Sequence, residues 1–237
     1  MPIPTFKYHP DPLATGSVEK SDAQCICCGR NQGFIYVGPV YAQEELDEQI
    51  CPWCIADGTA ARKYDATFKD EEGIGTCGDG QPVPEYVIEE VARRTPGFSG
   101  WQQEQWWSHC GDAGAFLGAA GYEELKTLGE DAILSIREST GLPLGQVWEE
   151  FFQALDKDGV PTAYVFRCTK CGAVGGKSGL QLSVRFGSRL CKNIKPSGGT
   201  SYSKVSINCG VPGRAVATSD LWPTLSAIGA KAASRVS

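Results

Sequence analysis

The sequence predicts an α+β fold: a small, irregular, zinc-stabilised domain of short strands, CxxC knuckles and several short helices, followed by a poorly ordered C-terminal extension. Three observations lead to this prediction. The 237 residues include eleven cysteines, and several of these stand in C-x2-C pairs. Segments rich in aromatic and β-branched residues, which favour strands, are short. Apolar residues recur at helical spacing in several other short segments.

Composition places the chain among folded proteins of a reducing compartment. Hydrophobic residues make up 41% and charged residues 21%, which is enough for a sizeable core. No stretch approaches the roughly 18 consecutive apolar residues of a membrane span, and no secretory signal opens the chain. We therefore expect a cytoplasmic protein without a membrane partner. In a reducing cytosol, many cysteines indicate metal ligation more often than disulfides.

Charge is distributed unevenly along the chain. Residues 1–171 carry 13 basic and 27 acidic residues, a net charge of −14, whereas residues 172–237 carry nine basic residues and one acid, a net charge of +8. The acidic body argues against broad electrostatic binding of nucleic acid. We expect a zinc-binding domain over residues 1–176 and a basic extension over residues 177–237. The composition of that extension fits two interpretations. It is either an out-of-frame or read-through segment, or it is a basic arm that binds nucleic acid.

The first part of the chain predicts few regular elements. Residues 5–24 indicate an extended loop because they contain two closely spaced prolines. Residues 33–38 predict a short strand, rich in aromatic and β-branched side chains. Residues 44–49 predict a short acidic helix or turn, and a helix is expected to begin near Cys51. The glycine-rich, polar residues 70–82 predict a loop.

Helices dominate the rest of the predicted domain. Pro84 opens a helix that ends at Thr95. Ser99 as N-cap predicts a helical element over residues 100–108, and Asp112 as N-cap predicts another short helix. Three further helices are expected at residues 121–125, 131–138 and 146–155, and a strand is expected at residues 162–167.

Two cysteine pairs give the strongest functional signal. Cys25-x2-Cys28 is followed, after 22 intervening residues, by Cys51-x2-Cys54. Two residues between cysteines let both thiolates face one point, about 2.3 Å from a zinc ion. Gly29 permits the tight turn of a knuckle, and the helix start at the second pair favours thiolate. We therefore predict a closed zinc site with four cysteine ligands.

Other interpretations of these cysteines are open. Cys51-Pro-Trp-Cys54 is similar to a thioredoxin-type redox motif, but that motif requires a βαβ surround. The cysteines could also be merely packed in a core. Cys27 is the surplus thiol of the first cluster, and it either replaces a neighbouring ligand or stays free.

A third pair, Cys168-x2-Cys171, repeats the knuckle pattern and needs two more ligands. His109 and Cys110 are the best donors, with Cys77 in reserve. The sequence thus predicts one or two zinc ions per chain.

The second site has its own open alternatives. Because His109 and Cys110 are adjacent, both are awkward as ligands of one tetrahedral ion, so one of them could lie outside the ligand set. Asp112 could orient a ligating imidazole through a hydrogen bond. The alternative without metal ligation is that His109 merely packs against Trp106 and Trp107.

Other motifs add little. The string Gly175-Gly176-Lys177-Ser178 resembles the end of a P-loop, but Cys171 stands where that motif requires glycine. Core packing is the default role of the tryptophans, and an aromatic ligand cleft is the alternative.

Several longer motifs together resemble the CbrC protein family of bacteria. They stand at residues 6–12, 25–29, 51–58, 95–101, 107–112 and 161–172. The resemblance covers about residues 5–176, and the chain departs from the family beyond Gly176. It implies a small bacterial cytosolic protein with cysteine-rich sites and a link with tolerance to E-group colicins. It implies no reaction, because the family has no assigned biochemical activity.

Three hypotheses of function follow. The favoured one is a zinc-stabilised binding or adaptor protein with an unidentified protein partner. The second is a metalloenzyme with an open metal position at His109, Cys110 and Asp112. The third is a thiol redox protein that uses Cys51 and Cys54. Four protein ligands indicate a structural metal, three plus water indicate a catalytic one, and a metal-free dithiol indicates redox chemistry.

Overall fold

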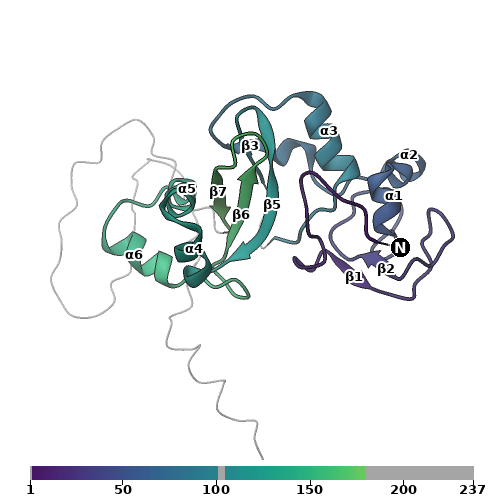
Figure 1. Cartoon of the computed structure of the whole chain (residues 1–237), viewed down its shortest axis with the longest axis horizontal. Coiled ribbons are helices and arrows are strands. Elements are labelled where there is room, and N and C mark those ends of the chain that lie inside the picture. The colour runs from purple at the N-terminus through teal and green to yellow at the C-terminus, as the bar shows by residue number, and fades with distance from the viewer. Residues whose placement is uncertain (1, 101–104, 180–237) are drawn as a thin grey trace, which may run out of the picture. The chain divides into compact units, whose positions relative to one another are not determined.

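The computed structural model describes residues 2–100 and 105–179, which lie in the first of two units of the chain, residues 1–187 (Figure 1). Its first elements are β1 (Val18–Lys20), β2 (Phe34–Tyr36), α1 (Pro52–Ala56), α2 (Thr59–Tyr64), the 3-10 helix η1 (Glu71–Gly73), β3 (Ile74–Gly78) and α3 (Glu85–Arg94). The later elements are β4 (Trp106–His109), β5 (Asp112–Ala120), α4 (Tyr122–Leu128), α5 (Glu130–Thr140), α6 (Gln146–Gln153), β6 (Ala163–Cys168) and β7 (Val174–Ser178). The expected α+β class is confirmed. From residue 180 onward, the predicted extension lies outside the described residues.

Two short strands bring the first cysteine pairs together. β1 and β2 pair antiparallel. The two ends of the loop between them, which contains Cys25 and Cys28, therefore lie close together. Tyr36 at the end of β2 forms a further bridge with Ile50, just before α1. Because Ile50 is fixed in this way, Cys51 at the start of α1 lies beside the β1–β2 loop.

A small apolar core supports this arrangement. Its buried members include Phe6, Val18, Ile35, Tyr36, Leu46, Ile50, Ile55 and Phe68. Each large apolar side chain contributes about 1.5–3 kcal/mol when it is fully buried. The rings of Tyr36 and Phe68 meet edge to face, with centroids 5.3 Å apart. The Tyr36 hydroxyl accepts a hydrogen bond from the Gly97 N–H at 3.1 Å, which links this core to the segment after α3.

A five-stranded sheet in the order β3-β4-β5-β6-β7 carries the second cysteine pair. β3 runs parallel to β4, and the other neighbours are antiparallel. The β4–β5 hairpin and the end of β6 therefore meet at one edge region, where Gly114 of β5 stands opposite Cys168 of β6.

The inner strand β6, between β5 and β7, is buried on both faces. Tyr164 and Phe166 point into an aromatic core, which also contains Phe98, Trp106 and Phe116. Val165 points to the opposite face, where it packs with the helices α4, α5 and α6. Because side chains of a strand alternate between faces, an almost wholly apolar sequence is what this strand requires. The rings of Phe98 and Phe116 are stacked, with centroids 4.0 Å apart.

Most of the predicted elements are confirmed. The strands expected at residues 33–38 and 162–167 correspond to β2 and β6. The helix after Pro84 is α3, and the three later helices are α4, α5 and α6. β1 and β7 were not expected.

Three expectations are wrong. Residues 70–82 contain η1 and β3, residues 106–108 belong to β4, and Asp112 begins β5 instead of capping a helix. For the two expected helices, the cause is tertiary packing, which overrides local helix signals. Gly114 illustrates it, since a Cβ there would lie 2.8 Å from the Trp107 ring. The remainder of the expected helix, residues 101–104, lies outside the described residues.

Candidate metal centres

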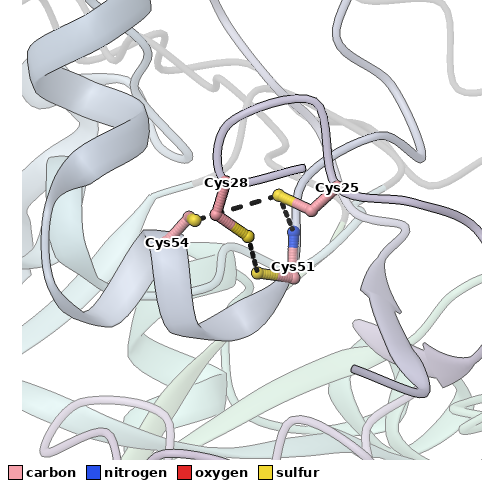
Figure 2. A group of neighbouring side chains, drawn as sticks. All are labelled: Cys25, Cys28, Cys51 and Cys54. Carbon is pink, nitrogen blue, oxygen red and sulfur yellow. Dashed lines mark hydrogen bonds between the residues drawn. The ribbon is translucent and has the colours of Figure 1, made fainter. Parts of the chain in front are cut away.

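Four cysteines from two segments converge in the N-terminal part of the fold. Cys25 and Cys28 come from the β1–β2 loop, and Cys51 and Cys54 come from the start of α1 (Figure 2). Their sulfur atoms all lie within 4.8 Å of one another. The Sγ–Sγ distance is 3.8 Å between Cys25 and Cys54, and 3.9 Å between Cys28 and Cys51. These are free thiols, and both close contacts join one segment to the other instead of closing a CxxC disulfide.

Polar hydrogens surround these sulfur atoms. The Cys51 N–H donates to Sγ of Cys25 at 3.3 Å. Nε2 of Gln32 donates to Sγ of Cys51 at 3.4 Å. Gly29, with a φ of 67°, turns the chain so that its N–H donates to the carbonyl oxygen of Cys25 at 2.7 Å. The two donors to sulfur, the Cys51 N–H and Gln32 Nε2, stabilise thiolate, which is the form that binds a metal. Sequence spacing gave no signal for Gln32.

The cysteines influence one another's protonation. Hydrogen bonds from the Cys51 thiol and from nearby backbone N–H groups lower the pKa of Cys25 to about 4. The same hydrogen bond to Cys25 raises the pKa of Cys51, and burial followed by the charge of Cys25 raises the pKa of Cys54. Without a cation, therefore, Cys25 is the thiolate favoured over Cys51 and Cys54. A divalent cation would let all four ionise.

A second group of four joins the β4–β5 turn to the end of β6. The donor atoms of His109, Cys110, Cys168 and Cys171 all lie within 4.8 Å of one another. Nδ1 of His109 is 3.1 Å from Sγ of Cys110 and 3.4 Å from Sγ of Cys171. The structure thus brings all eight predicted ligands together as two groups of four. Both groups could hold a metal ion.

The β4–β5 turn explains how two adjacent residues serve one site. His109 and Asp112 pair across the hairpin, so the turn consists of Cys110 and Gly111 alone. Their φ angles are 58° and 63°, which is the conformation of a type I′ hairpin turn. Cys110 accepts this left-handed conformation at a cost of about 1–2 kcal/mol. In this conformation the Cys110 sulfur lies on the same side as the His109 imidazole. Both adjacent residues can therefore place a donor atom in one group.

A knuckle supplies the other half of the second group. Sγ of Cys168 accepts hydrogen bonds from the N–H groups of Lys170 and Cys171, each at 3.4 Å. Gly172, with a φ of 78°, completes the turn. Burial alone would raise the pKa of Cys168, but the hydrogen bonds from the two N–H groups and from the His109 and Cys171 side chains together outweigh burial and lower this pKa to about 6.

The carboxylate beside His109 is Asp79, which sequence reasoning missed. Oδ2 of Asp79 lies 4.0 Å from Nε2 of His109 and accepts a hydrogen bond from the Cys110 N–H at 2.7 Å. Asp79 follows β3, and the parallel pairing of β3 with β4 places it here. Only knowledge of that pairing would have revealed it, because Asp79 belongs to no motif.

The expected role of Asp112 at the imidazole is wrong. Its carboxylate accepts hydrogen bonds from Lys7 Nζ at 3.0 Å, Tyr8 Oη at 2.8 Å and Thr169 Oγ1 at 2.6 Å. These donors occupy the carboxylate, so Asp112 joins the N-terminal segment and the knuckle loop to β5. An open metal position that uses Asp112 as a ligand is therefore not formed.

The remaining candidates lie outside both groups. Burial raises the pKa of Cys77 to about 11, and burial together with the charge of Cys25 raises the pKa of Cys27 to about 11. The reserve ligand Cys77 is not needed, because Cys110 completes the second group. Trp107 stacks on the His109 ring, with centroids 5.4 Å apart and planes 9° apart. His109 thus packs against Trp107 and also belongs to the second group of four.

The described residues are those of an α+β protein with two groups of side chains that could hold metal ions. Within residues 2–100 and 105–179, none of the helices has the length and apolar character of a membrane span. Residues 3–176 match the uncharacterised protein family UPF0167, and the chain belongs to this family.

Curated relatives cover the same region. A UPF0167 protein of Mycobacterium bovis and one of Mycobacterium tuberculosis are each 49% identical over 172 residues, which is 72% of this chain and 89% of theirs. A UPF0167 protein of Pseudomonas aeruginosa is 42% identical over 172 residues, which is 72% of this chain and 93% of its own. No solved structure matches the chain.

Proposed function

We propose that the protein is a zinc-binding adaptor, in which two structural zinc centres hold a small domain in shape for contact with a protein partner. The observation that carries this proposal is the spacing of the donor atoms. Tetrahedral zinc with Zn–S bonds of about 2.3 Å holds its sulfur ligands roughly 3.8 Å apart. The Sγ–Sγ distances of 3.8 Å and 3.9 Å in the first group have this value.

The second group supports the same metal. A Zn–N bond of about 2.0–2.1 Å and a Zn–S bond of about 2.3 Å place the two donor atoms roughly 3.5 Å apart. Nδ1 of His109 lies 3.4 Å from Sγ of Cys171. Three cysteines and one histidine form a standard structural zinc set, and soft thiolates favour zinc over magnesium or calcium.

A structural role is favoured over catalysis and redox chemistry. Each group supplies four protein donors, whereas a catalytic zinc keeps one position for water. Asp112 is occupied by other donors, which leaves the metalloenzyme alternative without its proposed third ligand. Cys51 and Cys54 make their close contacts with Cys28 and Cys25, which argues against a redox pair.

The proposal extends to the cellular setting. The free thiols suit a reducing cytoplasm, and the acidic body favours a protein partner over nucleic acid. The likeness to the CbrC family adds a role in tolerance to E-group colicins. Expression of the chain in a colicin-sensitive strain tests that role, and unchanged killing at equal protein level would remove it from the proposal.

Metal content and coordination test the core of the proposal. Protein purified without added metal is expected to contain two zinc ions per chain by mass spectrometry. X-ray absorption should give an average of 3.5 sulfur and 0.5 nitrogen ligands per zinc. One oxygen ligand at half of the zinc would indicate an open site and favour the metalloenzyme. Metal-free protein with native stability would contradict the proposal outright.

A histidine variant separates the two centres. His109→Ala should lower the affinity of one zinc ion and leave the other unchanged. Replacement of His9, which is buried and hydrogen-bonded to Pro96 and Thr15 and belongs to neither group of four, serves as the matched control. If His109→Ala retains two zinc ions with unchanged affinity, His109 is not a ligand.

A further inference from the structure

The two groups of four differ in how far solvent reaches their sulfur atoms. In the first group, three of the four cysteines are no more than 2% exposed. In the second group, Cys171 is exposed and Cys110 is half-buried, while Cys168 is buried. A small oxidant dissolved in water therefore reaches the second group, through Cys171, more readily than the first.

Cys110 and Cys171 stand on two turns that meet at the second group. Cys110 begins the two-residue turn between β4 and β5, and Cys171 belongs to the knuckle that follows β6. Their sulfur atoms lie within 4.8 Å of each other. Because neither residue lies in a helix or strand, a short movement of the turns brings the two sulfur atoms to the S–S bond length of about 2.05 Å.

A lysine ties the two turns together. Nζ of Lys170, the residue before Cys171, donates to the carbonyl oxygen of Cys110 at 2.9 Å and lies 3.4 Å from the carbonyl oxygen of Gly111. The ammonium group therefore links the knuckle to the β4–β5 turn. Its positive charge also favours thiolate at the neighbouring cysteines, and thiolate is the form that an oxidant attacks.

The buried sulfur of the second group is less suited to oxidation. Sγ of Cys168 accepts hydrogen bonds from the N–H groups of Lys170 and Cys171, and it lies 3.6 Å from the carbonyl oxygen of His109. A disulfide between Cys168 and Cys171 would disturb all of these contacts. The favoured partner of Cys171 is therefore Cys110, on the opposite turn.

We propose that Cys110 and Cys171 form a reversible oxidation site, at which a peroxide closes a disulfide between the two turns and the second group gives up its zinc ion. The proposal rests on the proposed zinc function. It goes beyond that function because it assigns a chemical response to one centre and not to the other.

The oxidation takes two steps and consumes one peroxide. The Cys171 thiolate attacks one oxygen of hydrogen peroxide, so that an S–O bond forms, the O–O bond breaks and hydroxide leaves. The Cys110 thiolate then attacks the sulfur of the resulting sulfenic acid, and an S–S bond replaces the S–O bond as a second hydroxide leaves. Two electrons pass from the sulfur atoms to the peroxide. His109 and Cys168 remain, and two donors fall short of the four that a structural zinc ion requires.

Oxidation of the full-length, zinc-loaded protein with hydrogen peroxide tests this proposal. A weak chromogenic chelator follows zinc release against a peroxide-free blank, and mass spectrometry of the alkylated, digested protein maps the disulfides. We expect release of one zinc ion per chain, in step with a disulfide between Cys110 and Cys171. Dithiothreitol with added zinc should restore the thiols and the metal. A first disulfide within either CxxC pair of the second or first group, or one that involves Cys77, Cys191 or Cys209, would overturn the proposal.

Two lysine variants give a matched comparison, because neither lysine belongs to a group of four. Lys170→Gln removes the tie between the turns and should slow disulfide formation by roughly threefold or more, with zinc content unchanged before oxidation. Lys63→Gln removes a lysine that donates to the carbonyl oxygens of Ile26 and Cys27 in the first group's loop, and it should oxidise at the parent rate. Equal rates in the two variants would overturn the role of Lys170.

Failure of this proposal is distinct from failure of the zinc function. A protein that contains two zinc ions and keeps both in peroxide overturns the oxidation site and leaves the zinc function standing. A protein purified without zinc fails the proposed function before peroxide is added, and its disulfide map still decides whether Cys110 and Cys171 pair.

Discussion

Asp79 lies 4.0 Å from Nε2 of His109, while Nδ1 of the same ring lies 3.4 Å from the Cys171 sulfur. One edge of the imidazole thus faces the cysteine group, and the other faces a carboxylate. A carboxylate on this side of the ring can orient a ligating histidine. The Asp79 carboxylate also accepts the Cys110 N–H, so it supports two neighbouring ligands at once.

Asp79→Asn is therefore expected to weaken zinc at the second centre by about tenfold or more, in line with the loss of similar outer-shell carboxylates. Competition with a chromogenic chelator measures this affinity, and Asp158→Asn, an exposed change elsewhere, is the control. Equal zinc affinity in the Asp79 and Asp158 variants would show that Asp79 does not support the centre.

Loss of a ligand in the first group should unfold the N-terminal part of the domain. Cys25 and Cys54 are buried in its small core, and the binding energy of a structural zinc is folding energy. Cys25→Ser and Cys54→Ser should therefore aggregate or lose their cooperative thermal transition. Cys27→Ser, beside them in sequence but outside the group of four, should keep both zinc ions. If the Cys25→Ser protein folds with one zinc ion, the first centre is not required for folding of the N-terminal part.

The two centres should differ in kinetic accessibility. Cys25, Cys51 and Cys54 are buried, whereas Cys171 is exposed. A chelator and an alkylating agent should therefore attack the second centre first, releasing one zinc ion while Cys171 is labelled. Mass spectrometry of labelled peptides over time gives the order. Rapid labelling of Cys51 and Cys54 in the native protein, with a reversible disulfide between them, would favour the redox hypothesis.

Acid should destabilise the fold through His9. This ring is fully buried, with Nδ1 2.7 Å from the Pro96 carbonyl and Nε2 2.6 Å from Thr15 Oγ1. Burial lowers the pKa of His9 to about 4, against an ordinary value of about 6.5. Between these values the unfolded chain binds a proton that the folded chain does not, so stability falls as pH decreases through this window.

The size of this effect is about 1 kcal/mol between pH 7 and pH 5.5. Urea unfolding at both pH values measures it. His9→Gln removes the titrating group but leaves the cysteines, so zinc loss in acid contributes equally to both proteins. If the parent and the variant lose the same stability, His9 does not carry the pH dependence.

The C-terminal limit of the folded domain should lie beyond residue 176. Lys177 and Ser178 pair with Tyr164 and Ala163 of β6, and the Gly179 N–H donates to the Thr162 carbonyl at 2.8 Å. A chain that ends at Gly179 should fold and bind two zinc ions. A chain that ends at Gly176 should be about 2–3 kcal/mol less stable, because each lost hydrogen bond is worth about 1 kcal/mol. Equal thermal midpoints would place the boundary where the family match ends.

Local patterns predicted the members of the two groups of four well and the strands poorly. Cys25, Cys28 and their counterparts could be recognised because two-residue spacing and a following glycine are features of a few adjacent residues. The helix α6 could be recognised because its apolar stripe repeats within its own length. Neither case requires knowledge of a distant segment.

The β4–β5 hairpin and Asp79 could not be predicted, because non-local pairing defines them. Trp106 and Trp107 fit a helix or a strand equally well until Gly114 and β6 are placed beside them. Cys110 shows the limit most clearly. Its left-handed turn conformation, rare for a residue with a side chain, is what places it beside His109, and no spacing rule suggests it.

The ligands of the two groups are spread very differently along the chain. The first group closes within residues 25–54, whereas the second joins residues 109–171. Doubling the length of a closed loop costs only about 0.6 kcal/mol, so the two closures differ little in entropy. They differ in order of synthesis, because a ribosome that has released residue 64 has delivered every ligand of the first group and none of the second. Under the proposed zinc function, the first group could therefore bind its ion while the sheet is still being made, and the second group could bind its ion only after β6 has taken its place beside β5.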